Sequence, residues 1–249
     1  MNNREHYGWI PDLPDQRDRV YGAPYATLQA LPPSVDLRDG CPPVEDQLAL
    51  GSCTSFAAGA AIRFARKKQG LPDFVTSHLF LYYNSRRQKT VDSGAYLRDV
   101  MKSASRLGDC PELEWPYVID HFDVHPPILC YQDALKDRVL SYQRVIRSLD
   151  QMKGCLASGW PFVLGFSVYE SFESAQVAQT GVVPMPGPNE AVLGGHAIVC
   201  VGYMDDKQQF IFRNSWGNWA DKGYGYIPYA YLMNKGLSSD FWTIRTISA

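Results

Sequence analysis

Apolar residues recur at a helical spacing after Cys53. Phe56, Ala60 and Phe64 follow one another at every fourth position, which places them on one side of a helix. Basic residues end the pattern, and Gly70 stops it. This arrangement predicts a central helix that begins at Cys53.

The rest of the chain divides into a helical and a strand-rich half. Similar apolar spacing predicts helices over residues 77–87, 96–107 and 150–157. Short apolar runs bounded by Gly, Pro or Asn predict strands at 160–168, 196–203, 208–214, 223–229 and 241–247. Helices followed by strands favour the α+β class. We therefore expect a helical lobe over residues 44–140 and a β lobe over 141–249.

Three separated segments carry residues suited to thiol chemistry. A thiolate at Cys53 would be favoured by the positive end of the predicted helix. His196 opens an apolar run that would fix its ring, and Asn214 offers an amide oxygen that sets the tautomer of a neighbouring imidazole. Gln47, six residues before Cys53, offers an amide donor for an oxyanion.

Together these residues resemble the papain family of cysteine peptidases. Its pattern is a Gln, a Cys six residues later, a distant His, and an Asn followed by Ser-Trp-Gly. The resemblance implies Cys53 as nucleophile, His196 as base and acid, Asn214 as its orienter and Gln47 as oxyanion donor. It also implies a papain-like fold, with the active-site cleft between a helical lobe and an antiparallel β-barrel-like lobe. The peptidase domain would span residues 34–249.

The chain departs from the family pattern at three places. Thr54 stands where the family has Trp, and Leu50 and Val91 replace a usual cysteine pair. Ser93 replaces the first glycine of a substrate-binding Gly-Gly loop. We therefore expect a divergent member without that disulfide.

The resemblance also implies the substrate-binding positions. Five of them, Ala95, Tyr96, Gly165, Gly194 and Ala197, would line the selecting pocket, and four of these five are Gly or Ala, which predicts a roomy, largely apolar pocket. The full set of substrate-binding positions is Gly94, Ala95, Tyr96, Gly165, Gly194, Gly195, Ala197 and Trp216.

Residues 1–33 contain five prolines and no helical or strand period. Family members often carry an N-terminal extension that blocks the cleft until it is removed. The aromatic side chains of Tyr7, Trp9, Tyr21 and Tyr25 could anchor this arm by burial. Two interpretations stay open: an inhibitory arm, which would make the chain a zymogen, or an arm packed on the surface of the mature fold.

The predicted function is hydrolysis of peptide bonds in a peptide or protein substrate through a thioester. The alternatives are an amidase or acyltransferase that uses the same thioester, and an inactive peptide-binding homologue. No cofactor is implied. The net charge of −2 gives no electrostatic reason for nucleic-acid binding.

Compartment and redox state stay open. The chain shows no apolar run of membrane-spanning length and no signal peptide, which fits a cytoplasmic protein or one exported without a visible signal. Disulfides among Cys41, Cys110, Cys130 and Cys155 cannot be assigned from sequence. A metal site at His121 and His125, with Cys110 and Cys130 as further ligands, would lack the tight Cys-x2-Cys spacing of zinc sites, so we expect no metal.

Overall fold

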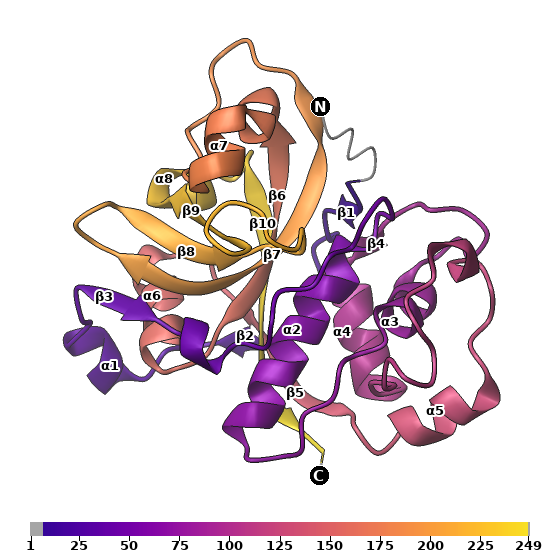
Figure 1. Cartoon of the computed structure of the whole chain (residues 1–249). Helices are drawn as coiled ribbons and strands as arrows, with labels where there is room; N and C mark the ends of the chain where they lie inside the picture. The colour runs from indigo at the N-terminus through magenta and orange to yellow at the C-terminus, as the bar shows by residue number, and fades with distance from the viewer. Residues whose placement is uncertain (1–6, 249) are drawn as a thin grey trace.

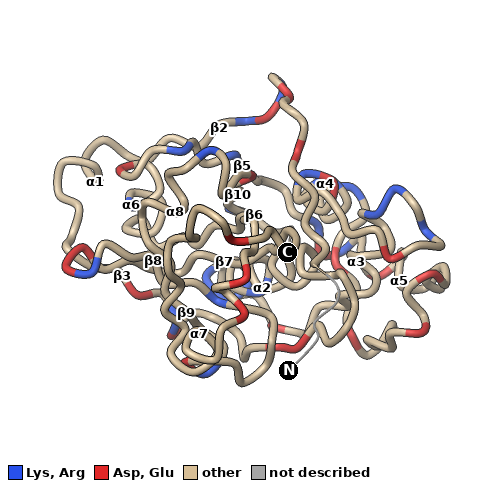
Figure 2. The backbone as a smooth tube through the Cα atoms, turned by 90° about the horizontal axis from the view of Figure 1, so that it is seen from above, with Lys and Arg blue, Asp and Glu red and all other residues tan. Residues whose placement is uncertain are grey.

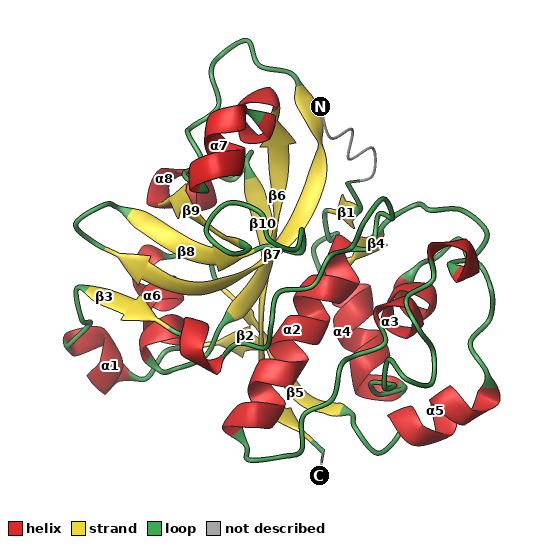
Figure 3. Ribbon diagram, viewed as in Figure 1, coloured by secondary structure: helices red, strands yellow, loops and turns green. Residues whose placement is uncertain are grey.

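The longer helices gather on one side of the molecule and most of the strands on the other. The computed structural model describes residues 7–248. Helices drawn in purple and magenta lie beside a large sheet drawn mainly in orange and yellow (Figure 1), and the same division is visible by element type in Figure 3. The predicted α+β class is confirmed.

The helical half is built around α2 (Cys53–Lys68). This helix begins at Cys53, as predicted, and its side chains are buried from Cys53 to Arg66. Alanines dominate its sequence because it packs on both sides, against the sheet and against the other helices. These are α3 (His78–Ser85), α4 (Leu97–Arg106) and α5 (Ile128–Ala134), with 3-10 turns at Arg38–Gly40 and Ile119–His121.

In the helical half, α3 and α4 match their predicted ranges closely. In α3, the Ser77 side chain accepts a hydrogen bond from the backbone N–H of Phe80, so Ser77 is the expected N-cap. Helix α4 shortens the predicted 96–107 by one residue at each end. Helix α5 was not predicted, because its seven residues follow two prolines and are too few to establish a period.

The main sheet has the order β2-β5-β10-β6-β7-β8-β9, and β3 pairs with β7. All its pairings are antiparallel except that of β2 with β5. Over residues 7–248 the two end strands do not pair, so the sheet is open rather than the closed barrel suggested by a β-barrel-like lobe. The strands are β2 (Val20–Tyr21), β3 (Ser34–Asp36), β5 (Val139–Val145), β6 (Phe162–Tyr169), β7 (Val192–Met204), β8 (Gln209–Arg213), β9 (Tyr224–Pro228) and β10 (Ser238–Ile247).

Strand alternation gives the sheet two buried faces. Val163 and Val199 join the apolar cluster around α2, whereas Phe162, Leu164 and Ile198 join a second cluster on the opposite face. The second face is covered by short helices. They are α6 (Leu149–Ala157), α7 (Ala175–Thr180), α8 (Tyr229–Met233) and the 3-10 turn Glu170–Glu173.

The N-terminal arm has more regular structure than its sequence predicts. It contains β1 (Trp9–Ile10), β2 and α1 (Tyr25–Gln29). Strand β1 pairs in parallel with β4 (Ala95–Tyr96). Two-residue strands leave no period in a sequence, because their hydrogen-bond partners lie far away in the chain. Trp9 and Tyr21 are buried, but Tyr25 is 76% exposed and anchors nothing.

Charged residues of both signs are spread over the two halves (Figure 2). One ion pair links the N-terminal arm to the helical half: Arg98 on α4 pairs with Asp18, in the segment between β1 and β2. Within residues 7–248, none of the helices has the length and apolar character needed to cross a bilayer.

Candidate active site

Cys53 is the first residue of α2 and is fully buried. Burial raises the pKa of its thiol to about 11, although backbone N–H groups of Ala197 and Gly8 act in the opposite direction. The helix start alone favours a low pKa, so the direction here is the reverse of the one expected. Burial therefore outweighs the effect of the helix start, and the backbone contact with Gly8 places the arm beside the sulfur.

His196 lies on β7 and is fully buried. Its Nε2 is 2.8 Å from Oδ1 of Asn214, and the same oxygen accepts a hydrogen bond from the backbone N–H of Ser215. The ring of Trp216 lies 4.9 Å from the His196 ring, between centroids. The amide oxygen of Asn214 is thereby held against one imidazole nitrogen, under the cover of an indole.

Gln47 is 2% exposed and is held from several sides. Its Oε1 accepts from the Ser215 hydroxyl at 2.6 Å, and its Nε2 donates to the carbonyl of Leu50 at 3.0 Å. Because Ser215 directly follows Asn214, this contact ties the loop of Gln47 to the turn that positions His196.

Tyr117 is a supporting residue that the sequence analysis missed. Its hydroxyl donates to the backbone carbonyl of Gln47 at 2.8 Å and lies 2.6 Å from the hydroxyl of Ser52, the residue before Cys53. Burial raises its pKa, so the hydroxyl stays protonated and able to donate. No periodic or spacing signal marks Tyr117, because its partners are some seventy positions earlier in the chain.

The arm passes directly over Cys53. The carbonyl of Gly8 accepts a hydrogen bond of 2.8 Å from the backbone N–H of Ala95. A Cβ added to Gly8 would lie 1.7 Å from the carbonyl oxygen of Gly51, and one added to Gly94 would lie 2.2 Å from that of Gly8. Glycine is therefore needed at both positions for the backbone segments to approach each other this closely.

Trp9 packs against β6 and β7 of the sheet. Glycines at 165 and 195 form the walls of the pocket that holds its ring, since a Cβ at Gly165 would lie 1.9 Å from the indole. The indole Nε1 donates to Oδ2 of Asp240, which is 1% exposed. The pocket is therefore apolar along its walls and acidic at its end.

Tyr7 covers the other side of the site. Its ring lies 6.0 Å from that of His196 and 6.3 Å from that of Trp216, between centroids. Its hydroxyl donates to the carboxylate of Glu173, and a Cβ at Gly194 would lie 2.6 Å from its Cβ.

A buried charge cluster fixes the arm beyond Trp9. Arg144 contacts the carboxylates of Asp12, Asp18 and Asp240 at 3.6, 3.1 and 2.8 Å. The backbone N–H of Asp12 also donates to Asp240 at 2.7 Å. Burial, and secondarily Asp240, raises the pKa of Asp12 to about 6.

The substrate-binding positions implied by the family resemblance meet the arm. Gly8 is contacted by Gly94 and Ala95, and Trp9 is contacted by Gly165 and Gly195. Tyr7 is contacted by Gly194 and Trp216. The N–H of Ala197 points at Cys53. Tyr96 differs: its backbone pairs with Ile10, but its ring lies 4.1 Å from the guanidinium of Arg87. Within residues 7–248, the one group of three potential metal ligands includes none of these residues and neither His121 nor His125.

The chain is similar to known proteins over most of its length. Residues 31–240 match the family described as papain family cysteine protease. An uncharacterised peptidase C1-like protein of Acanthamoeba polyphaga mimivirus is 35% identical over 272 residues, covering 98% of this chain and 88% of the viral protein. Cysteine proteinase 2 of Entamoeba histolytica is 27% identical over 212 residues, covering 80% of this chain and 64% of that protein.

Solved structures give the same result. Xylellain, a cysteine protease from Xylella fastidiosa, matches with a TM-score of 0.93 at 42% identity, over 98% of this chain and 97% of that one. A procathepsin B from Trypanosoma congolense matches with a TM-score of 0.73 over 99% of this chain and 87% of that one. Its identity of 18% supports a shared fold alone.

Proposed function

Because the chain belongs to the papain family of cysteine proteases, we propose that it cleaves peptide bonds with Cys53, His196, Asn214 and Gln47 in the roles described below. The observation that carries this proposal is the 2.8 Å contact between His196 Nε2 and Asn214 Oδ1, beside a cysteine at a helix start. The pair holds the imidazole in one orientation and adds no charge that would neutralise an imidazolium.

The proposed reaction proceeds through an acyl-enzyme. Since Asn214 occupies Nε2, proton exchange with Cys53 falls to Nδ1 of His196. The thiolate attacks the scissile carbonyl, and the oxyanion receives donors from Gln47 Nε2 and the Cys53 N–H. His196 protonates the departing amine, which leaves a thioester. It then takes a proton from water, whose oxygen attacks the thioester and releases the acid.

We propose that the arm is an intramolecular inhibitor. Three successive residues, Tyr7, Gly8 and Trp9, contact the positions where the family resemblance puts substrate. With the arm in place the Cys53 thiol is fully buried, and this burial raises its pKa. A peptide substrate would have to displace β1 from β4 before its carbonyl could reach the sulfur.

The same contacts revise the expected specificity. The selecting pocket was expected to be largely apolar, but Trp9 reaches the buried carboxylate of Asp240 at its end. Departure of the arm removes two donors from this carboxylate, the Trp9 indole and the Asp12 N–H, and leaves Arg144. We therefore propose that the pocket prefers a long side chain with a terminal donor, such as arginine, over an aliphatic one.

Labelling with an epoxide or vinyl-sulfone probe tests the chemistry. We expect a single adduct at Cys53 in the chain with Trp9→Ala, loss of the adduct in Cys53→Ser, and strong slowing in His196→Ala. Cys41→Ser, which removes another partly accessible thiol, is the matched control and keeps the adduct. Equal labelling with His196→Ala would contradict the proposed base. An added amine that becomes joined to the acyl group would indicate an acyltransferase instead.

A further inference from the structure

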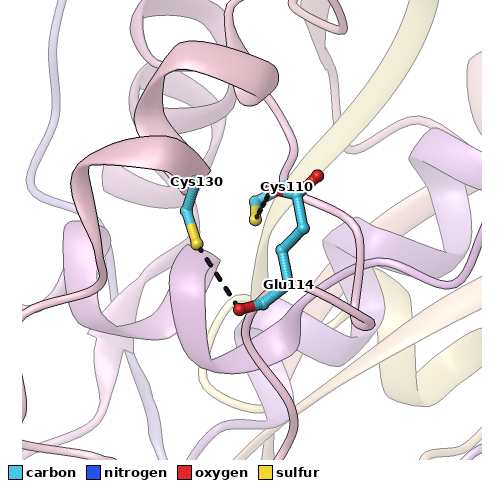
Figure 4. Close-up of side chains that lie close together, drawn as sticks. All are labelled: Cys110, Glu114 and Cys130. Carbon is cyan, nitrogen blue, oxygen red and sulfur yellow. Dashed lines mark hydrogen bonds between the residues drawn. The ribbon is translucent and has the colours of Figure 1, made fainter.

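A second group of reactive side chains lies outside the active site. Cys110, Glu114 and Cys130 offer two sulfurs and a carboxylate oxygen within 4.8 Å of one another (Figure 4). Both cysteines are buried and carry free thiols, and Glu114 reaches the solvent. The mechanism proposed above uses none of the three.

The backbone that carries these donors is well fixed. The carbonyl of Cys110 accepts from the N–H of Ser77, the cap of α3, at 2.7 Å. The N–H of Glu114 donates to Pro111 at 3.0 Å, and that of Cys130 donates to Pro127 at 3.0 Å. The three donors therefore converge without a rearrangement of the main chain, which is what a preformed metal site requires.

Acidic groups lie beside the two thiols. Sγ of Cys110 is 3.5 Å from Oε2 of Glu114. Asp133, which forms an ion pair with Lys136, lies on the same helix as Cys130. A bound dication would stabilise the thiolates and the carboxylate in their deprotonated forms.

We propose that Cys110, Cys130 and Glu114 bind one thiophilic divalent cation of the Zn²⁺ type, with water or the Asp133 carboxylate as the fourth ligand. Two thiolates with one carboxylate suit such a cation and do not suit Mg²⁺ or Ca²⁺. The sequence argued against a metal because the cysteines lack the short zinc spacing. The fold supplies proximity instead, by bringing the first turn of α5 beside the loop that follows α4.

The site would clip α5 to the loop that contains Tyr117. This loop meets the active site through the Tyr117 hydroxyl, which contacts Gln47 and Ser52. Metal binding would therefore raise the thermal midpoint of unfolding.

Cobalt titration tests the proposal. The full-length chain with Cys53→Ser, which removes the competing nucleophilic thiol, is reduced, freed of metal and titrated with Co²⁺. We expect one equivalent to bind with a thiolate-to-cobalt charge-transfer band, and Zn²⁺ to displace it. Cys110→Ser and Cys130→Ser should each remove the band, and Glu114→Gln should weaken binding by about 10-fold or more.

Matched controls separate this site from adventitious binding. Cys41→Ser removes a thiol outside the group, and Asp123→Asn removes an exposed carboxylate of the same loop; both should bind Co²⁺ as the parent does. If a cysteine variant unfolds at a lower temperature than the parent, the Glu114→Gln variant and native mass spectrometry of the parent decide whether the metal binds at this site.

Three results would overturn the proposal. They are a cobalt complex without the thiolate band, an unchanged band in the Cys110→Ser/Cys130→Ser chain, and a Cys110–Cys130 disulfide found by non-reducing peptide mapping of the protein as isolated. A disulfide would show that the two cysteines are oxidised to each other and do not bind a metal.

Discussion

The indole Nε1 of Trp9 lies 3.1 Å from Oδ2 of Asp240, and this contact joins the arm to the end of a glycine-walled pocket. The carboxylate of Asp240 is buried, so its oxygens need hydrogen-bond donors whether the arm is docked or released. The contact therefore bears on two questions at once: how firmly the arm is held, and what side chain replaces it.

Trp9→Ala should loosen the arm and expose Cys53. The substitution empties the pocket and leaves Asp240 short of a donor, at a cost to arm docking of roughly 3 kcal/mol. We expect labelling of Cys53 by a thiol probe to accelerate on the order of 100-fold. Tyr25→Ala is the matched control, because that ring is 76% exposed and should leave the rate unchanged. A Trp9→Ala chain that labels no faster than the parent would refute inhibition by the arm.

Docking of the arm should weaken as pH rises through the window from 3.8 to about 6. The pKa of Asp12 is raised in the docked state from 3.8 to about 6, so the docked arm binds a proton more tightly than the released arm. Acid therefore favours docking, and this single group contributes at most about 3 kcal/mol.

Hydrogen exchange checks the pH dependence. Protection of the backbone amides of residues 8, 9, 10 and 12, corrected for the intrinsic rate, should fall as pH rises across that window. Asp12→Asn should flatten the dependence. Stronger protection at neutral than at acidic pH would show that other groups control docking.

Asp240 should control the preference for arginine over leucine at the residue that enters the pocket. Asp240→Asn should reduce the ratio of kcat/KM for an arginine and a leucine substrate by roughly 10- to 100-fold. This ratio does not depend on how much enzyme is covered by the arm, since the arm competes equally with both substrates. Ser239→Ala, the adjacent change, should leave the ratio as it is. A ratio that favours leucine in the parent would refute the specificity proposal while leaving the peptidase assignment intact.

Tyr117→Phe should lower kcat more than it changes KM. The lost hydroxyl holds the carbonyl of Gln47 and the hydroxyl of Ser52, so the change loosens the oxyanion donors without removing them. We expect about a 10-fold loss in kcat, corresponding to about 1.4 kcal/mol. Tyr131→Phe removes a hydroxyl bonded to Asn84, outside the site, and serves as the control. An equal loss in both variants would point to general destabilisation.

The central residues of the candidate site could be predicted from the sequence, because their placement depends on local pattern and on a recognisable spacing. The start of α2 at Cys53 and the cap at Ser77 follow from neighbouring residues. The His196–Asn214 contact follows from the family spacing and the strand register. These features are encoded within short segments.

The parts that could not be predicted depend on partners far away in the chain. Trp9 meets Asp240 across 231 positions, and Arg144 meets Asp18 across 126. No periodicity records such pairs. The raised pKa of Cys53 was missed for the same reason, since it results from burial among segments that are distant in the chain.

The arm is continuous with the body of the protein through β2 and α1, and this continuity would set the strength of the inhibition proposed above. A tethered segment has a fixed effective concentration near its site, commonly in the millimolar range, whatever the concentration of the protein. Dilution alone would not activate the enzyme. A single cut in the exposed stretch around Leu13 and Arg17 would turn the arm into a separate peptide that dilution carries away. Activation by such a cut would then be irreversible in practice, without any change in the contacts themselves.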